Sequence, residues 1–143
     1  MTTSQTSARL GTAATNSSAA RPLRLFLGLD AAVTAGNGLI YLIAAGPVGD
    51  LLDMNTGFLR AIGVFLTVYG VLVGLLAAQQ VPSATATKVV IEANLLWAVA
   101  SVATAIFGWF DPNTIGTVWI LMQAVVVGGF AVLQISGLRK LTN

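Results

Sequence analysis

The amino-acid sequence predicts an all-α fold: a polytopic membrane protein built as a four-transmembrane-helix bundle, with both termini cytoplasmic. Hydrophobic residues make up 56% of the 143 residues and charged residues 8%, whereas an average soluble protein has about 25% charged residues. Mean hydropathy is +0.85. Four apolar segments, at about 23–45, 58–78, 88–109 and 114–137, each reach the roughly 20 residues that a helix needs to cross a bilayer. They predict one four-helix transmembrane domain over residues 21–140 and leave no room for a large domain outside the membrane.

Residues 1–20 precede the first span and are predicted to form a disordered polar tail. They are rich in Ser, Thr, Ala, Asn and Gln and contain almost no bulky apolar side chains, so they cannot bury enough surface to order themselves. A cleavable signal peptide is the alternative for the tail and the apolar run behind it. That run is about twice as long as the apolar region of a signal peptide and contains Asp30 and Asn37. We therefore expect it to be retained as a span.

The first span, 23–45, carries polar side chains along one side. On a helix with 3.6 residues per turn, one narrow stripe contains Asp30, Thr34, Asn37 and Tyr41. An ionisable or amide group that faces lipid costs on the order of a few kcal/mol. We therefore expect this stripe to face the other three spans.

The second span, 58–78, follows a loop rich in Gly, Pro and Asp and has small residues along one face. That candidate helix-packing face consists of Gly63, Thr67, Gly70 and Gly74, and its last two glycines form a GxxxG element. Small residues at this spacing let a neighbouring backbone approach closely. The face either forms a dimer contact or packs against another helix of the same chain. We favour the second, because a four-helix bundle already supplies neighbours.

The third and fourth spans, 88–109 and 114–137, are separated from their neighbours by polar turns that contain proline, at 79–87 and 111–113. One face of the third span contains Asn94, Trp97, Ser101 and Thr104. One stripe of the fourth span contains Gln123, Phe130 and Gln134. Each of these spans therefore also has a face that carries polar groups.

The basic residues predict the orientation of the bundle. Six of the seven lie on the side of the two termini and the middle loop: Arg9, Arg21, Arg24, Lys88, Arg139 and Lys140. The other side has only Arg60, together with the acids Asp50, Asp53 and Asp111. An excess of Lys and Arg is typical of cytoplasmic loops. We therefore expect both termini in the cytoplasm and the protein in the cytoplasmic membrane.

Polar residues from different spans are expected to meet inside the bundle. Counting inward from the span ends at ~1.5 Å per residue places Tyr69 near the depth of Asp30, and Gln123 near that of Asn37. The candidate intramembrane polar seam therefore contains Asp30, Thr34, Asn37, Tyr41, Tyr69 and Gln123. An acid inside a membrane is a functional candidate, because its protonation can couple to the movement of protons or solutes. The alternative is structural, with Asp30 hydrogen-bonded by Thr34 and its neighbours so that it fixes the helix register.

The composition argues against most enzyme and metal chemistry. Histidine and cysteine are both absent, which removes the usual ligands of haem, iron–sulfur clusters and most zinc and copper sites. A Ser-His-Asp triad cannot form, and no GxSxG or P-loop motif is present. We expect no enzyme activity and no catalytic, cofactor-binding or metal-binding residue. The basic residues are scattered, so nucleic acid is not an expected partner, whereas the lipid bilayer is.

The two halves of the chain show a weak internal repeat. Each half has an acid near the start of its first span, a glycine near the start of its second span and a glutamine near the end of that span: Asp30 and Glu92, Gly57 and Gly116, Gln79 and Gln134. Duplication of a hairpin is one origin of small bundles, and coincidence between two unrelated hairpins is the other explanation.

Four segments carry a resemblance to known proteins: LRLFLGLDAAVTAGNGLIYL, FLRAIGVFLTVYG, NLLWAVAS and AVVVGGFAVLQ. With Asp30, Asn37, Tyr41 and Trp97 as landmarks, the chain resembles the small four-span integral membrane proteins common in actinobacterial genomes, most of which have no assigned function. The resemblance covers nearly all of residues 22–140. It implies a place in the cytoplasmic membrane and supplies no catalytic residue.

Two functions are consistent with these features. The first is a non-enzymatic integral membrane protein that acts through helix packing, with itself or with a membrane partner; the face from Gly63 to Gly74 motivates it. The alternative is a small oligomeric carrier or channel component that uses the polar seam around Asp30. Four spans are few for a carrier, so the alternative also predicts at least a dimer.

Overall fold

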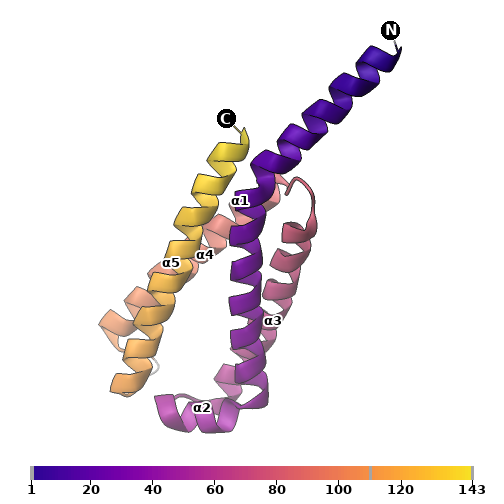
Figure 1. Ribbon diagram of the computed structural model, residues 1–143. Coiled ribbons are helices and arrows are strands. Elements are labelled where there is room, and N and C mark those ends of the chain that lie inside the picture. Colours follow the sequence, from indigo (N-terminus) through magenta and orange to yellow (C-terminus); the bar gives the residue numbers. More distant parts are fainter. Residues whose placement is uncertain (1, 110, 143) are drawn as a thin grey trace.

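The computed structural model describes residues 2–109 and 111–142, with side chains from residue 17 onward. The helices are α1 (Thr2–Ile43), α2 (Ala45–Leu52), α3 (Thr56–Ala78), α4 (Ala84–Phe107) and α5 (Thr114–Thr142) (Figure 1). Four segments are long and apolar enough to cross a membrane: Ser17–Ile43, Thr56–Ala78, Ala84–Phe107 and Thr114–Thr142. The predicted all-α four-helix bundle is thus confirmed, and the chain is a multi-pass membrane protein.

The helices differ from the predicted spans mainly at their ends. Most of the predicted tail, residues 1–20, lies outside the part of the chain whose side chains are described. Residues 17–20 are described and are helical, and Ala20 is fully buried. The small Ala and Ser residues before the apolar run allow the helix to extend upstream. At the other end of the chain, α5 continues past Gly137, whose missing side chain leaves room for the backbone of Leu23.

Local capping explains where the helices begin and end. Asn55 precedes α3, and its side chain accepts a hydrogen bond from the Phe58 N–H at 3.0 Å. Ser83 caps α4 in the same way at 3.2 Å. Gly108 ends α4 in the left-handed conformation, with φ of 67°, which costs glycine little. The third span therefore ends at residue 107 rather than at 109.

The long helices form two close pairs, α1 with α3 and α4 with α5, joined by packing between α1 and α5. The backbones of α3 and α4 approach each other closely at few points, and the two helices meet through side chains, where Tyr69 bonds to Asn94. Figure 1 shows both termini at one end of the bundle, here called the terminal end, and α2 lying across the other, here called the α2 end. At the α2 end, Asn113 donates from its side chain to the Leu51 carbonyl oxygen at 2.9 Å and so ties α2 to the turn before α5.

The small-residue face of α3 packs against α1 of the same chain. A Cβ atom added to Gly70 would lie 2.7 Å from the backbone nitrogen of Ala35 and 2.8 Å from its Cβ, and one added to Gly63 would lie 2.9 Å from the Gly38 carbonyl oxygen. Gly74 faces the Cβ of Ala31 at 3.7 Å. The distances at Gly63 and Gly70 leave no space for a side chain, so the close approach of α1 and α3 depends on these two glycines, whereas a Cβ at Gly74 would make an ordinary contact.

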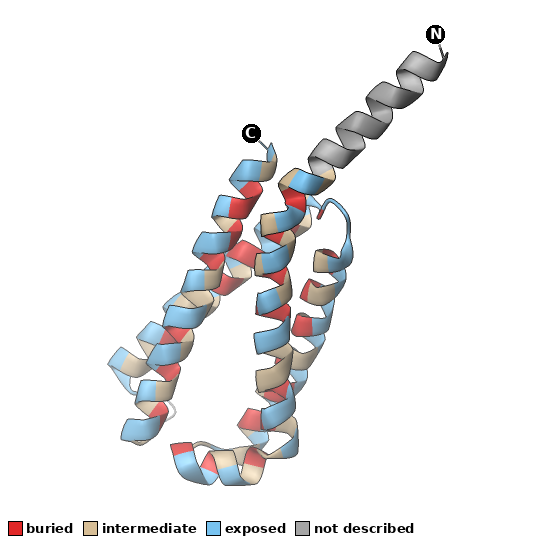
Figure 2. Ribbon diagram, viewed as in Figure 1, coloured by how far each residue is buried: buried red, intermediate tan, exposed pale blue. Residues whose placement is uncertain are grey.

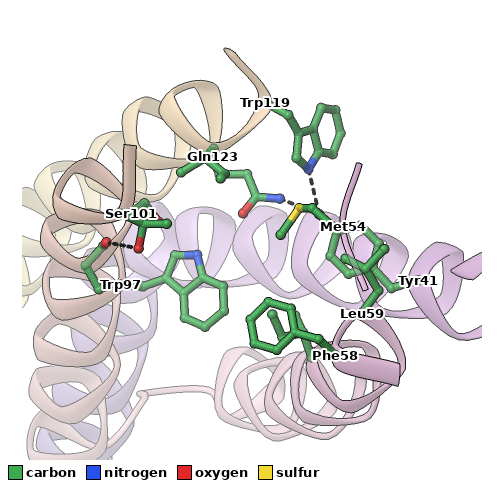
Figure 3. A pocket seen from close by; sticks show the side chains of 12 residues that line it. Tyr41, Met54, Phe58, Leu59, Trp97, Ser101, Trp119 and Gln123 are labelled. Atoms are coloured by element: carbon green, nitrogen blue, oxygen red, sulfur yellow. Dashed lines mark hydrogen bonds between the residues drawn. The ribbon is translucent and has the colours of Figure 1, made fainter. Parts of the chain in front are cut away.

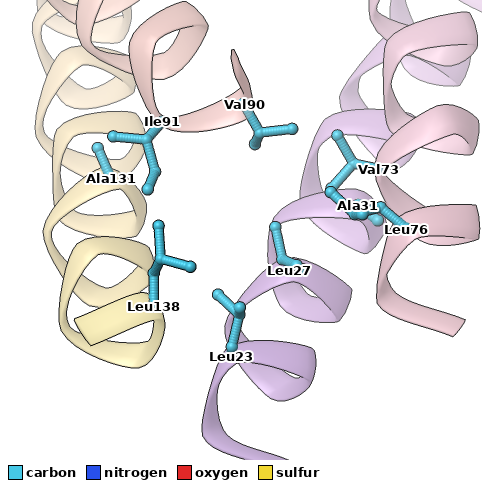
Figure 4. Close-up of a cluster of buried hydrophobic side chains, with 9 residues drawn as sticks. All are labelled: Leu23, Leu27, Ala31, Val73, Leu76, Val90, Ile91, Ala131 and Leu138. Atoms are coloured by element: carbon cyan, nitrogen blue, oxygen red, sulfur yellow. The ribbon is translucent and has the colours of Figure 1, made fainter. Parts of the chain in front are cut away.

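The apolar core lies toward the terminal end. Nine buried side chains from all four long helices meet there (Figure 4): Leu23, Leu27, Ala31, Val73, Leu76, Val90, Ile91, Ala131 and Leu138. We call this group the apolar cluster. Buried positions lie on the inward sides of the helices and exposed ones on the outward sides (Figure 2). Large apolar residues such as Leu96 and Val125, 71% and 75% exposed, are suited to contact with lipid tails.

Candidate functional site

Asp30 on α1 lies in the middle of the bundle and is only 1% exposed. Its Oδ2 atom accepts two hydrogen bonds at 2.7 Å, one from Nδ2 of Asn94 on α4 and one from Nε2 of Gln134 on α5. Its Oδ1 atom accepts one at 2.8 Å from the hydroxyl of Thr34, one turn later on α1. The carboxyl group therefore connects three of the four spans.

Further hydrogen bonds extend this group to the fourth span. Asn94 also donates from Nδ2 to Oε1 of Gln134 at 3.0 Å. Tyr69 on α3 donates to Oδ1 of Asn94 at 3.3 Å and lies 3.4 Å from the Val90 carbonyl oxygen. We call these five side chains the Asp30 cluster: Asp30, Thr34, Tyr69, Asn94 and Gln134. No buried polar side-chain atom in the described part of the chain lacks a hydrogen-bond partner.

No cation accompanies Asp30 among the described residues, where its partners are a hydroxyl and two amides. Arg24, on the same helix, donates instead from Nε to the Ala77 carbonyl oxygen near the end of α3, at 3.0 Å. A carboxylate without a counter-ion in a low-dielectric interior relies on hydrogen bonds, each worth about 1.5–3 kcal/mol when the acceptor is charged. The cluster therefore surrounds an acidic side chain with neutral hydrogen-bond donors alone.

The two sides of the Asp30 cluster differ in packing. Toward the terminal end the apolar cluster packs against the Asp30 cluster, with Leu23 and Leu27 before Asp30 on α1. A cavity of about 370 Å³ lies farther toward the terminal end between α4 and α5, and no member of the Asp30 cluster lines it. Toward the α2 end, a cavity of about 290 Å³ lies between the helices. Access to the carboxyl group is therefore less obstructed from the α2 end.

The cavity at the α2 end contains a second polar group (Figure 3). The hydroxyl oxygen of Tyr41 accepts a hydrogen bond from Nε1 of Trp119 at 2.6 Å and another from Nε2 of Gln123 at 2.5 Å. Trp97 and Phe58 line the same space from α4 and α3. This cavity, which we call the α2-end cavity, is thus lined mainly by aromatic and apolar side chains.

Smaller cavities lie between the α2-end cavity and the Asp30 cluster. A space of about 210 Å³ shares Trp97 and Gln123 with the α2-end cavity and is also lined by Asn37 and Thr34. A third, of about 50 Å³, shares Thr34 and Trp97 with the second and reaches Tyr69 and Asn94. Neighbouring cavities thus share wall residues from the α2 end to three members of the Asp30 cluster, Thr34, Tyr69 and Asn94.

The structure divides the predicted polar seam into two groups. Asp30, Thr34 and Tyr69 belong to the Asp30 cluster, whereas Tyr41 and Gln123 meet at the α2-end cavity. Asn37 lies between the groups, lines the middle cavity and makes no hydrogen bond with any described residue. The first span therefore points its whole stripe inward, but its polar groups find different partners.

Sequence reasoning missed two members of the site, Asn94 and Gln134, although it placed each on the polar face of its span. A depth count could have found them. Asn94 lies six residues after Lys88, and Gln134 lies six before Lys140, so both are about as deep as Asp30, which lies six after Arg24.

No protein-family model, curated protein or solved structure is significantly similar to this chain. Only the residues and their geometry therefore bear on its function.

Proposed function

We propose that the protein is a non-enzymatic carrier or channel component of the cytoplasmic membrane in which Asp30 takes up and releases a proton. One observation carries the proposal: cavities with shared wall residues lie between the α2 end and three members of the Asp30 cluster, while the apolar cluster packs against the opposite side. A buried acid with cavities on one side and apolar packing on the other fits a coupling site, because the proton must not leak through.

The hydrogen bonds of the cluster fit both protonation states. In the ionised state, Asp30 accepts from Thr34, Asn94 and Gln134. When a proton binds to Oδ1, the carboxyl can donate to the Thr34 hydroxyl, which can turn its own proton to a carbonyl oxygen of its helix. The two amides keep donating to Oδ2. Uptake of a proton thus changes the charge by one unit without breaking the links between the helices.

The proposed orientation sets the direction of access. The excess of Lys and Arg at the terminal end favours a cytoplasmic location for that end, so the cavities would open toward the outside. Because four spans are few for a carrier, we propose at least a homodimer as the working unit.

Proton flux tests this proposal directly. The full chain is reconstituted into liposomes with an entrapped pH-sensitive dye, and a pH gradient is imposed with the membrane potential clamped by valinomycin and potassium. We expect faster acidification than in protein-free liposomes, and loss of that excess in Asp30→Asn. The matched control is Glu92→Gln, which neutralises an exposed acid on α4 and should retain the flux. Equal rates for wild type and Asp30→Asn, with both variants monodisperse, would contradict the proposal.

The second candidate is a protein that acts only through helix packing, with itself or with a membrane partner. The observation that favours it is that the buried polar atoms of the Asp30 cluster all have hydrogen-bond partners within the protein, as expected of a cluster that only holds helices together. The face from Gly63 to Gly74 no longer supports it, because α1 already occupies that face. Crosslinking of the protein in native membranes tests this candidate; a strict monomer with no crosslinked partner would exclude it.

A further inference from the structure

The walls of the α2-end cavity carry no charge. Neither this cavity nor the middle one is lined by an Asp, Glu, Lys or Arg side chain. A charged ligand would lose its hydration there without gaining an ion pair, at a cost of several kcal/mol. An occupant of this cavity is therefore uncharged.

Aromatic rings surround the cavity from all four spans. They belong to Tyr41 on α1, Phe58 on α3, Trp97 on α4 and Trp119 on α5. Figure 3 shows the rings of Trp97 and Phe58 on one side of the open space and the Trp119 ring on the other. Flat rings of this kind pack well against another flat ring, in stacked or edge-to-face geometry.

Two hydrogen-bond donors in the wall are unused. Trp97 and Ser101, one turn apart on α4, make no hydrogen bond with any described residue. Both line the cavity, and Ser101 is only 9% exposed. By contrast, the N–H groups of Trp119 and Gln123 are already bonded to Tyr41. Neither donor atom is sealed from the cavity, since every fully buried polar side-chain atom among the described residues has a hydrogen-bond partner. An occupant that displaces water from these two donors would leave them unsatisfied, which is costly, unless it offers acceptors of its own.

The size and position of the cavity limit the occupant further. A volume of about 290 Å³ lies at the lower end of the range for ligand sites, which is about 300–1,000 Å³. Helices α3 and α4 both line the cavity, and their backbones approach each other closely at few points. The rings of Phe65 and Trp97 bridge them, so a lipid-soluble molecule that enters from the bilayer would pass between side chains rather than between packed backbones.

We infer that the α2-end cavity binds an uncharged, planar, lipid-soluble ring compound with carbonyl acceptors, of the aromatic ketone or quinone class. The ring lies among the aromatic side chains, and its carbonyl oxygens accept from the Trp97 indole and the Ser101 hydroxyl. This inference goes beyond the proposed proton site and does not depend on it.

The probe for this site is 2-methyl-1,4-naphthoquinone, because quinones quench tryptophan fluorescence. The full chain carries Trp109→Phe, which removes the tryptophan stacked on Phe107 at the end of α4 and leaves the two in the cavity wall. In detergent micelles we expect saturable quenching. The matched ligand is 2-methylnaphthalene, which has the same rings without carbonyl groups. It should displace the quinone only at clearly higher concentrations.

One variant and two controls test the Ser101 hydroxyl as a hydrogen-bond donor to the ligand. Ser101→Ala should weaken binding about fivefold, the value of one neutral hydrogen bond, and should fold normally because Ser101 has no partner in the protein. Ser136→Ala, at an exposed position on α5, is the control and should bind as before. Asp30→Asn should also bind as before, so failure of the proton proposal and failure of this one are separable.

Three results would overturn the inference. Quenching that rises linearly without saturation would mean that the probe only dissolves in the micelle. Unchanged affinity in Ser101→Ala, together with unchanged affinity in Trp97→Phe, would mean that the donors do not take part. Equal competition by 2-methylnaphthalene would mean that the cavity accepts any apolar molecule, such as a lipid acyl chain.

Discussion

The two ends of this bundle use their polar side chains in opposite ways. Around Asp30, side chains from all four spans bond to one another, and the apolar cluster fills the space beside them. Toward the α2 end, Trp97, Ser101 and Asn37 face cavities and make no hydrogen bond with any described residue. A bundle can therefore concentrate its specific contacts at one level and leave another level open for a ligand.

The cause of this difference lies in α4 rather than in the pairing of α1 with α3. Small residues keep α1 and α3 close at both levels, at Gly70 beside Ala35 and at Gly63 beside Gly38. Helix α4 meets the other spans through Asn94, but beyond that level it follows α5 and hardly contacts α3. Between α3 and α4 at this level lie the bulky rings of Phe65 and Trp97, stacked with centroids 6.1 Å apart. Rings of this size keep the two backbones apart.

The largest effect is expected for Gly70→Leu, because Gly70 lies in the close contact between α3 and α1. A Cβ at this position already lies 2.7 Å from the Ala35 backbone, so the leucine must push α1 and α3 apart. We expect a loss of about 3 kcal/mol or failure to fold, measured by thermal unfolding in micelles with circular dichroism. Gly129→Leu is the control, because nothing lies within 4 Å of its added Cβ. Equal melting temperatures for the two variants would contradict the packing.

An intermediate effect is expected when an asparagine is removed from the Asp30 cluster, compared with one removed from the wall of the middle cavity. Asn94→Ala deletes the amide that bonds Asp30, Gln134 and Tyr69 and leaves buried groups unsatisfied, so we expect a loss of about 2 kcal/mol. Asn37→Ala removes the same side chain where it has no partner, and we expect a change below about 0.5 kcal/mol. Unfolding by heat or by a denaturing detergent measures both. Similar losses in the two variants would remove the distinction between the ends.

Sequence reasoning predicted the fold because its signals are local. The length and polarity of each apolar segment identify a span, and the stripe from Asp30 to Tyr41 identifies the inward side of the first span. The number of spans can be predicted without knowing how one helix is rotated against another, and the structure confirms four. The orientation across the membrane stays a prediction, since it depends on the distribution of charge relative to a bilayer.

The site was only partly predictable because it depends on how the helices turn about their own axes. Eleven residues separate Asp30 from Tyr41, which is a distance of about 16 Å along a helix, so one set of partners cannot satisfy the whole stripe. The depth count grouped Tyr69 with Asp30, and in the structure Asn94 links the two. Asn94 and Gln134 were left out because the periodicity of each span does not say which neighbour its polar face meets. Asn94 bonds to Asp30 because of how α4 packs beside α1, which the sequence of either helix alone does not specify.

A smaller effect than that of Asn94→Ala is expected for Tyr41→Phe, which removes a polar group from the wall of the α2-end cavity. Its hydroxyl accepts from Trp119 and Gln123, and the loss leaves two donors beside a cavity large enough for water, which can replace the lost acceptor. We therefore expect a change in stability of about 0.5 kcal/mol, together with a red shift of Trp119 emission in the Trp109→Phe background as the indole becomes hydrated. A loss as large as that of Asn94→Ala, without a red shift, would mean that the α2 end is held as firmly as the level of Asp30. In that case the cavity would be a packing defect of a rigid bundle rather than a place for a ligand.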